Sequence, residues 1–407
     1  MNSTNMKSLN IALIIALFIS IFACNNPNDE IVVVPGTQAA KERTIILYLS
    51  GDEYKISRWI GDNIDLICEN LNSSVDSEKV NIVAFVDILS SYGSIPANPI
   101  VYEIKYNKTK NIVDTTSVKQ YPELNSLSVS HIKDFLSMVK EKYPAETYNL
   151  IWGSHGSGWY PNPNLVKNRA LGPDGNSYIE LDEFEQAIPE DMVFDYIIFD
   201  ACFMAQAEIA MQLKDKVKYI MSAPSEIPIA GFPYKDINLM CNARTEEDYI
   251  AICESFHTKY ILEGIGHTVS LIKTDEMDNL ASAFKQVIES CDDETLRNFN
   301  ISNVQNFDGQ QYCFNYITAC YDLQNIAYQL IDNETLYENL TNAIKKVIKY
   351  EAHSQLISFG TTIRIKTCCG ITSFWPTKGN AIANTYYYNY DWCKASGLDY
   401  IINYIIE

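Results

Sequence analysis

The sequence predicts an α/β fold in which a mostly parallel central sheet is covered by helices on both faces. Strand-like apolar runs alternate with helical stretches along the chain, and this alternation is typical of open, doubly wound sheets. Several runs are apolar on both faces and end in small or acidic residues, as buried parallel strands do. The 407 residues are 47% hydrophobic and 20% charged, which excludes a disordered or fibrous protein.

The N-terminal residues do not belong to this predicted fold. Lys7 precedes an apolar run from Ile11 to Ala23, which is shorter than the ~20 residues of a membrane-spanning helix and has the form of a secretory signal segment. The run ends in a small residue directly before Cys24, which resembles a bacterial lipobox. Residues 1–23 are therefore predicted to be a lipoprotein signal peptide, with a plainly cleaved signal peptide as the alternative. A lipid on Cys24 would anchor the exported chain to the cell envelope, and we expect the outer membrane.

The folded part is expected to begin after a flexible tether. Residues 24–42 contain Asn, Pro, Asp and Gly around a short apolar patch at residues 31–34, which indicates a linker with little structure of its own. Apolar runs then predict strands at residues 44–49, 81–87, 149–152, 196–199, 217–221 and 268–272. A hairpin is predicted from residues 102–106 and 112–116. Helical spacing of apolar residues predicts helices near 60–71, 132–139 and 247–262.

The last part of the chain is predicted to pack against the sheet. It contains amphipathic stretches at residues 280–288 and 340–348 and a tyrosine-rich tail. We therefore divide the folded part into a domain of residues 43–275 and a C-terminal region of residues 276–407.

Charge and cysteine content exclude some functions. The 51 Asp+Glu and 31 Lys+Arg give a formal net charge of -20, which repels phosphate backbones and anionic lipid headgroups. We therefore expect no nucleic-acid partner, contact with a membrane only through the N-terminal lipid, and a monomer. The cysteines after Cys24 show no regular spacing, and the Cys368-Cys369 pair lacks a C-x-x-C metal pattern. We predict no metal site and expect most cysteines to be buried thiols.

Two consecutive predicted strands end in residues that can carry out chemistry. Strand 149–152 leads into Gly153-Ser154-His155-Gly156-Ser157-Gly158-Trp159, and strand 196–199 leads into Asp200-Ala201-Cys202. Functional residues of such sheets gather at the carboxyl ends of the strands. We therefore expect His155 and Cys202 to lie side by side.

This pairing suits nucleophilic catalysis. A free thiol has a pKa of about 8.5 and only the thiolate attacks a carbonyl, so a nearby imidazole and a helix N-terminus are the groups that would activate it. The segment after Cys202 is predicted to be helical from Phe203 to Ala210. Backbone N–H groups of the glycine-rich loop can stabilise an oxyanion, which is typically worth ~3 kcal/mol.

Each of these residues also has a purely structural interpretation. A Cys after a buried strand is usually part of the core, and a His in a glycine loop usually serves a turn or packing. An Asp between a strand and a helix, such as Asp200, is a common N-cap. The joint occurrence of His155 and Cys202 at these two strand ends nevertheless favours catalysis.

The arrangement of His-Gly-x-Gly after one strand and Asp-Ala-Cys after the next resembles the clostripain family, in the caspase and gingipain clan of cysteine peptidases. The similarity covers roughly residues 43 to 400. Besides the two strand ends, it rests on Tyr48-x-x-Gly51-Asp52 and on residues 217–234, 268–272, 321–323 and 370–376. The resemblance implies a caspase-like α/β/α sandwich.

The resemblance also implies roles for single residues. Cys202 would be the nucleophile and His155 the general base and acid, with the N–H groups of Gly156 and Cys202 forming the oxyanion hole. Asp200 would line the S1 pocket and select a basic side chain, Arg before Lys because a guanidinium is bound bidentately. The reaction would be peptide-bond hydrolysis through a thioester.

Members of this family often mature by self-cleavage between the His and Cys strands. Lys167 and Arg169 are the only basic residues in that stretch, so we expect cleavage after one of them. The alternative is an ordinary solvated loop with two charges.

We expect no cofactor. Some relatives need calcium, but the chain has no D-x-[DN]-x-[DN]-G loop, and Asp174-Gly175-Asn176 is too short to predict a site. A second class of function stays open, in which a surface lipoprotein keeps the peptidase-like fold and binds peptides or a partner protein without cleaving. The presence of both His155 and Cys202 favours the peptidase.

Overall fold

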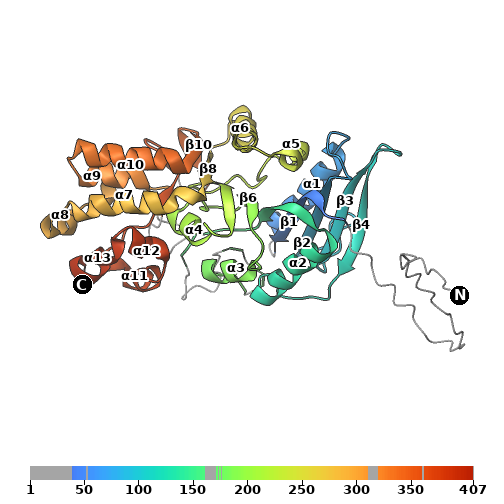
Figure 1. Cartoon of the computed structure of the whole chain (residues 1–407), viewed down its shortest axis with the longest axis horizontal. Coiled ribbons are helices and arrows are strands. Elements are labelled where there is room, and N and C mark those ends of the chain that lie inside the picture. Colours follow the sequence, from blue (N-terminus) through green and yellow to red (C-terminus); the bar gives the residue numbers. More distant parts are fainter. Residues whose placement is uncertain are drawn as a thin grey trace, which may run out of the picture. The chain divides into compact units, whose positions relative to one another are not determined.

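A central sheet of nine strands runs through the part of the chain that the structure describes (Figure 1). The structure is a computed structural model, and it describes residues 39–51, 54–160, 171–172, 174–175, 177–309, 320–359 and 362–406. The strand order is β10-β8-β7-β6-β5-β1-β2-β3-β4. The bounds are β1 Lys41–Gly51, β2 Val80–Ile88, β3 Ile100–Asn107, β4 Ile112–Gln120, β5 Ala145–Gly153, β6 Phe194–Asp200, β7 Val217–Ser222, β8 Thr268–Lys273 and β10 Ile348–His353.

The middle of this sheet is parallel and its edges are antiparallel. Strands β2, β1, β5, β6 and β7 pair in parallel in that order. At one edge β3 and β4 form the predicted hairpin, and at the other β8 and β10 pair antiparallel. The middle strands are buried along almost their whole length, which explains why their sequences are apolar on both faces. The predicted α/β class with a mostly parallel sheet is thereby confirmed.

Helices cover both faces of the sheet. Successive strand residues point to opposite sides, so strands that are apolar throughout present two apolar faces for helices to cover. Ile45 and Leu47 of β1 belong to one buried apolar cluster with residues of α1, α5 and α6, whereas Ile46 and Tyr48 belong to a second with residues of α2, α3, α4, α7 and α10. In Figure 1, α1, α5 and α6 lie above the sheet and α2, α3 and α4 lie below it. The bounds are α1 Tyr54–Asn70, α2 Val129–Lys142, α3 Leu181–Ala187, α4 Ala207–Gln212, α5 Ile237–Asn242, α6 Glu246–Glu263, α7 Met277–Glu289 and α10 Glu334–Val347.

Short elements complete the described chain. They are the strands β9 Tyr321–Asp322, β11 Leu356–Ser358, β12 Thr362–Arg364 and β13 Thr372–Ser373, the helices α8 Asp293–Asn298, α9 Leu323–Leu330, α11 Ala381–Tyr387, α12 Asp391–Ala395 and α13 Leu398–Tyr400, and the single turns η1 Tyr234–Asp236, η2 Thr274–Glu276, η3 Ile301–Asn303, η4 Lys378–Asn380 and η5 Ile401–Ile405.

The C-terminal region contributes to the sheet itself as well as covering it. Strand β10 pairs with β8, with His353 opposite Thr268. The sequence analysis treated Ile348 as the last residue of a helical stretch, but α10 ends at Val347 and Ile348 begins the strand. The region of residues 276–407 therefore supplies one edge of the central sheet.

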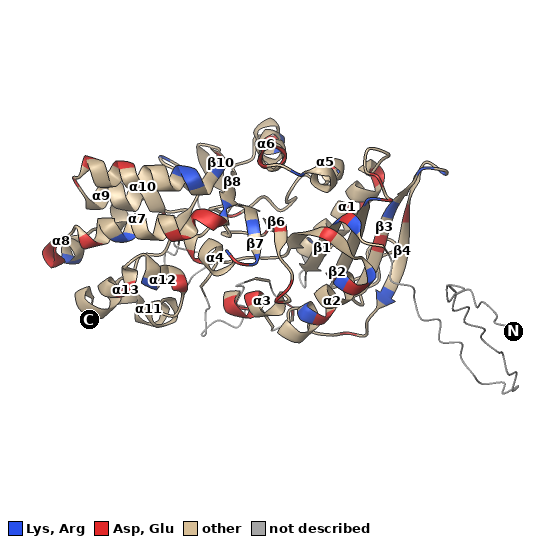
Figure 2. Cartoon of the chain, in the orientation of Figure 1, with Lys and Arg blue, Asp and Glu red and all other residues tan. Residues whose placement is uncertain are grey.

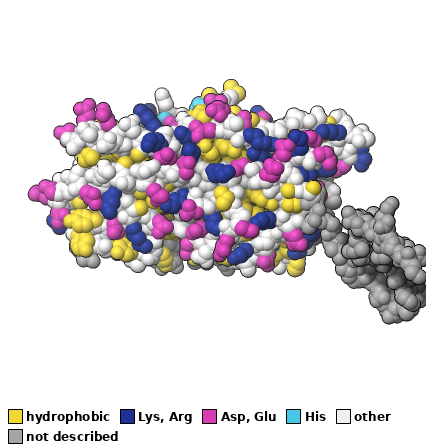
Figure 3. Space-filling model, viewed as in Figure 1, with side chains coloured by type: hydrophobic (Ala, Val, Ile, Leu, Met, Phe, Trp, Pro, Cys, Tyr) yellow, Lys and Arg dark blue, Asp and Glu magenta, His cyan; other side chains and the backbone are white. Residues whose placement is uncertain are grey.

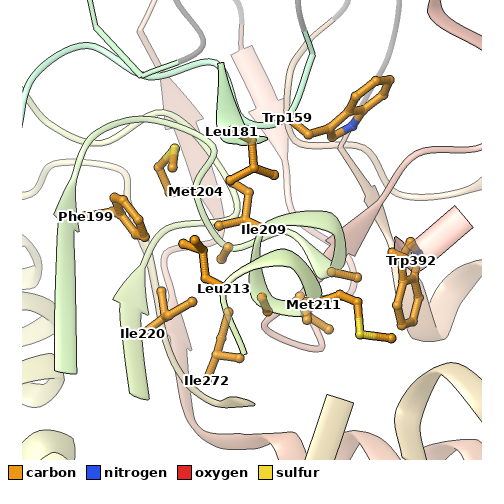
Figure 4. Close-up of a cluster of buried hydrophobic side chains, with 14 of the residues drawn as sticks. Trp159, Leu181, Phe199, Met204, Ile209, Met211, Leu213, Ile220, Ile272 and Trp392 are labelled. Carbon is orange, nitrogen blue, oxygen red and sulfur yellow. The ribbon is translucent and has the colours of Figure 1, made fainter. Parts of the chain in front are cut away.

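The C-terminal helices are also joined to α4 through a buried carboxyl group. Glu208 of α4 accepts hydrogen bonds from Ser373 Oγ at 3.0 Å, from the Phe374 N–H at 2.9 Å and from Tyr387 Oη at 2.8 Å. Burial raises the pKa of Glu208 to about 7. Figure 4 shows the apolar surroundings, where Ile209 and Met211 pack between the sheet and Trp392 of α12. The first turn of the helix that follows Cys202 is thus held by the C-terminal region of the chain.

The surface carries charges of both signs. Figure 2 shows acidic and basic residues along most of the helices, and on the face seen in Figure 3 they are mixed, without a large area of one sign. Among the helices of the described residues, none is both long enough and apolar enough to cross a membrane.

The burial of the cysteines in the described part of the chain differs from the prediction. Cys241, Cys253, Cys320 and Cys393 are buried, whereas Cys68, Cys202, Cys291, Cys368 and Cys369 are half-buried. The expectation that most are buried was therefore wrong for this part of the chain.

Candidate active site

The ends of β5 and β6 bring His155 and Cys202 to the same edge of the sheet. The strands are parallel neighbours with Gly153 opposite Asp200, and the Ser154 N–H donates to the Asp200 carbonyl at 3.3 Å. Two residues further on, a Cβ atom added to Gly156 would lie 2.6 Å from the Cys202 carbonyl oxygen and 3.1 Å from the Cys202 backbone nitrogen. The residues on either side of His155 therefore lie against the Asp200–Cys202 segment, and only glycine fits at position 156.

The glycine-rich loop is fixed at its far end by Gln206. The Trp159 N–H donates to Gln206 Oε1 at 2.9 Å, and Tyr390 Oη donates to the Trp159 carbonyl at 3.0 Å. Gly158 has a φ of +76°, and a side chain there would collide with the Gln206 amide. Small residues are needed in this loop because other backbone and side chains approach it closely.

The chain after Cys202 does not enter a helix at once, which corrects the predicted helix from Phe203. The Phe203 N–H donates to the Ser225 carbonyl at 3.0 Å and the Ala205 N–H to the Ala223 carbonyl at 3.1 Å. These tertiary bonds hold the segment in a non-helical conformation, and α4 begins only at Ala207 with Gln206 as its N-cap. The helix that follows Cys202 therefore begins five residues beyond it, and Asp200 is not the N-cap of that helix.

The backbone turns sharply directly after Cys202. Phe203 has a φ of +62°, a left-handed conformation that costs roughly 1–2 kcal/mol for a residue other than glycine. The buried Phe203 side chain and the hydrogen bond of its N–H hold it there. This turn leaves Cys202 at the point where strand β6 has ended and the chain changes direction.

Both reactive side chains are partly accessible. His155 and Cys202 are half-buried, and Cys202 packs against the apolar clusters on both faces of the sheet. Its Sγ atom accepts a hydrogen bond from the Ile227 N–H at 3.4 Å. Because a donor favours the charged form of its acceptor, this N–H stabilises the thiolate relative to the thiol.

Asp200 lies two residues before Cys202 and is held by the loop after β7. Its Oδ1 accepts from the Phe232 N–H at 3.1 Å and its Oδ2 from Tyr234 Oη at 2.7 Å. Burial raises the pKa of Asp200, while these two bonds and the Lys259 ammonium oppose the rise. Gly231 has a φ of +61°, and a side chain there would collide with the carboxylate.

Sequence reasoning missed these partners of Asp200. Residues 231–234 were noted for their similarity to a family segment, but no spacing in the sequence indicates that Tyr234 reaches Asp200.

The predicted cleavage residues Lys167 and Arg169, and the predicted lipidation residue Cys24, lie outside the described residues. Among the described residues, the side chains close enough to share a metal ion are Glu351, His353 and Cys368, and they are not at the ends of β5 and β6.

Comparison with known proteins identifies the family. A family model described as "Clostripain family" matches residues 47–401, which include both strand ends. The chain belongs to the clostripain family. Clostripain from Hathewaya histolytica is 26% identical over 194 residues, which are 42% of this chain and 36% of that protein. The match thus spans about a third of the length of this relative.

Solved structures of clostripain-family proteins share the fold. An inactive zymogen C11 protease from Parabacteroides distasonis is 24% identical, with 89% of this chain and 99% of that chain covered and a TM-score of 0.74. A secreted C11 cysteine protease from Bacteroides thetaiotaomicron, in complex with an irreversible peptide inhibitor, is 22% identical, with 88% and 99% covered and a TM-score of 0.76. The α/β architecture with its large, mostly parallel sheet is therefore that of solved C11 proteases.

Proposed function

We propose that this clostripain-family chain is a cysteine endopeptidase that hydrolyses peptide bonds after basic residues. One observation carries the proposal: two neighbouring parallel strands deliver a half-buried imidazole and a half-buried thiol to one sheet edge, with the Gly156 backbone against Cys202. The membership in a cysteine peptidase family supports the same chemistry. The reaction requires no cofactor, and the partner is a peptide or protein substrate.

In the proposed mechanism, His155 takes the proton of the Cys202 thiol, and Sγ attacks the carbonyl carbon of the scissile bond. The N–H groups of Gly156 and Cys202 stabilise the oxyanion of the tetrahedral intermediate. The intermediate collapses to a thioester as His155 gives its proton to the leaving amine. A water molecule, deprotonated by His155, then hydrolyses the thioester and restores the thiol.

Because α4 begins only at Ala207, its N-terminus is not among the groups that we propose to activate the thiol. The imidazole of His155 and the Ile227 N–H, which already donates to Sγ, are the groups proposed to favour the thiolate. Both come from segments at the carboxyl ends of sheet strands, so the sheet supports their positions.

Asp200 is proposed to bind the basic side chain on the acyl side of the cleaved bond. Its carboxylate is oriented by Tyr234 and Phe232, and each oxygen can accept a further hydrogen bond from the substrate. Gly231 leaves the position against Oδ2 free of a side chain. A bound guanidinium or ammonium would also favour the ionised form of Asp200 against the effect of its burial.

The proposed activity is tested by hydrolysis of fluorogenic peptides that end in Arg, Lys or Asp. We expect kcat/KM to be highest for Arg, lower for Lys, and at least about 100-fold lower for Asp than for Arg. With an Asp peptide, the ion pair between the substrate side chain and Asp200 is replaced by repulsion between two carboxylates. A thiol alkylator should abolish turnover of every peptide. Binding of the peptides without hydrolysis of any of them would instead identify a non-catalytic peptide-binding protein.

We also propose that the chain matures by cutting itself after Lys167 or Arg169, because these are the basic residues between His155 and Cys202. Purified full-length protein should release new termini at one of these positions, whereas the Cys202→Ala chain should stay intact. Substituting both basic residues by Gln should prevent the cut and leave the alkylation of Cys202 unchanged. Identical, uncut chains in the wild-type and Cys202→Ala samples would refute self-cleavage.

Export with lipidation at Cys24 is a separate proposal, supported by the apolar segment that ends there. Cells that express the full-length chain and grow with a labelled fatty acid should label the protein. Cys24→Ala should remove the label, whereas Cys68→Ala, a change in the folded part, should not. An exported but unlabelled wild-type chain would indicate a plainly cleaved signal peptide.

A further inference from the structure

Three side chains of the types that bind metal ions meet at the edge of the sheet. Glu351 and His353 alternate along β10 and therefore point to the same face, and Cys368 comes from the segment before β13. One ligand atom from each lies within 4.8 Å of the others, and all three residues are half-buried. His353 Nδ1 lies 2.6 Å from Glu351 Oε1. Strand β10 is the last strand of the sheet.

The segment that carries Cys368 is held firmly against β10. The Cys369 N–H donates to Asp322 Oδ2 at 2.6 Å, and Asp322 also accepts from the Asn325 N–H at 2.7 Å as the N-cap of α9. A Cβ atom on Gly370 would lie 3.1 Å from Ser270 Oγ and 3.2 Å from Glu351 Cγ. The thiol is therefore placed by backbone contacts on two sides, and its position is largely pre-organised.

The charges around this group favour a cation. Glu351 and the buried Asp322 both act electrostatically on the Cys368 thiol and on His353. Two carboxylates and the Cys368 thiol thus lie near the His353 imidazole, and the imidazoles of His257 and His267 also act on it electrostatically. A divalent ion between Glu351 and Cys368 would balance this negative charge in a partly buried place, where Coulomb interactions are stronger than in water.

We propose that Glu351, His353 and Cys368 form a binding site for a zinc-type divalent metal ion. In tetrahedral zinc sites the bonds are about 2.0–2.3 Å long, so that ligand atoms lie roughly 3.5 Å apart. The separations of up to 4.8 Å therefore close by about 1 Å when an ion binds. The thiol gives its proton to solvent, and the proton held between His353 Nδ1 and Glu351 Oε1 also leaves to solvent or moves to Nε2. The metal ion takes the place of that hydrogen bond, and a water molecule takes the fourth position. Thiolate and imidazole ligands select zinc over calcium or magnesium.

The position of the site indicates a structural role. An ion there would join β10 to the Cys368 segment beside β8. Thr268, which pairs with His353 across the strands, accepts from the Ser225 N–H at 3.2 Å, and Ser225 in turn accepts from the Phe203 N–H. The ion would therefore stabilise the sheet edge that supports the segment after Cys202.

The test uses the full-length chain with Cys202→Ala, because His155 and Cys202 are a second imidazole and thiol that bind metal ions. Titration with Co²⁺ should reach one equivalent and produce the charge-transfer absorption of a thiolate–cobalt bond, and Zn²⁺ should remove that absorption by competition. Adding Cys368→Ser should abolish the absorption, and adding His353→Gln should weaken binding at least about tenfold. Cys291→Ser removes another half-buried thiol and should change neither quantity. Zn²⁺ should raise the melting temperature only where the site is intact.

Three results would overturn the proposal. They are the absence of saturable Co²⁺ binding, a cobalt absorption that persists unchanged in the Cys368→Ser chain, and a Cys368–Cys369 disulfide in the chain as purified from cells. Each would leave Glu351 and His353 as an ion pair without a thiolate ligand from Cys368. If the Cys368→Ser chain does not fold, the His353→Gln chain and the cobalt spectrum of the parent chain decide the question.

Discussion

Replacing Cys202 with Ala should lower kcat for an Arg peptide by at least about 10⁴-fold, because the acyl-enzyme can no longer form. The thiol is half-buried at the end of β6, and its removal leaves the Gly156 and Cys202 N–H groups in place. Substrate binding should therefore persist while turnover is lost. Steady-state kinetics and direct measurement of peptide affinity in the variant separate these two effects.

Cys291→Ala is the matched control for this experiment. Cys291 is also half-buried, but it lies after α7, where its thiol donates to the Val287 carbonyl at 3.4 Å. We expect its kcat to stay within about twofold of the parent value, since surface changes away from a site have small effects. A Cys202→Ala chain that retains a tenth or more of the parent kcat would contradict the proposed nucleophile.

Replacing Asp200 with Asn should lower kcat/KM for Arg peptides by roughly 10³-fold, which corresponds to about 4 kcal/mol. The amide has nearly the same shape, and its oxygen can still accept one bond from Phe232 or Tyr234. The negative charge, however, is lost, so the guanidinium would be desolvated without a counter-charge. Neutral peptides should be hydrolysed at nearly the parent rate.

Glu226→Gln serves as the control for charge selection. Glu226 is another half-buried carboxyl group. It directly precedes Ile227, whose N–H donates to Cys202 Sγ. We expect this variant to keep the preference for Arg over neutral peptides. The opposite pattern, with selectivity lost in Glu226→Gln and kept in Asp200→Asn, would assign the selection of basic side chains to Glu226.

The sequence was sufficient to predict the parallel strands and the placement of His155 and Cys202 at one sheet edge, because local patterns carry that information. The run from Thr44 to Leu49 is apolar on both faces, and β1 is indeed a buried strand with neighbours on both sides. The order of His155 and Cys202 at two successive strand ends needs only the rule that parallel strands share an edge.

Other features depend on contacts between distant segments and leave no local pattern. Residues 203–205 have helical propensity, but their N–H groups pair with Ala223 and Ser225 and the helix begins later. The helical spacing of α10 continues into Ile348, so strand β10 was not predicted. Tyr234 reaches Asp200 only because the loop after β7 folds back over the end of β6.

The strand order has a consequence for a chain that is cut between residues 161 and 170. The first piece would contain β1 to β5 and the second β6 to β10, yet β5 and β6 are hydrogen-bonded neighbours in one sheet. Arg43 of β1 and Asp195 of β6 also lie 3.8 Å apart across the two pieces, and Tyr390 bonds to Trp159. Proteolysis would therefore turn one polypeptide into two interlocked subunits, which migrate together on native gels and separate only in denaturant.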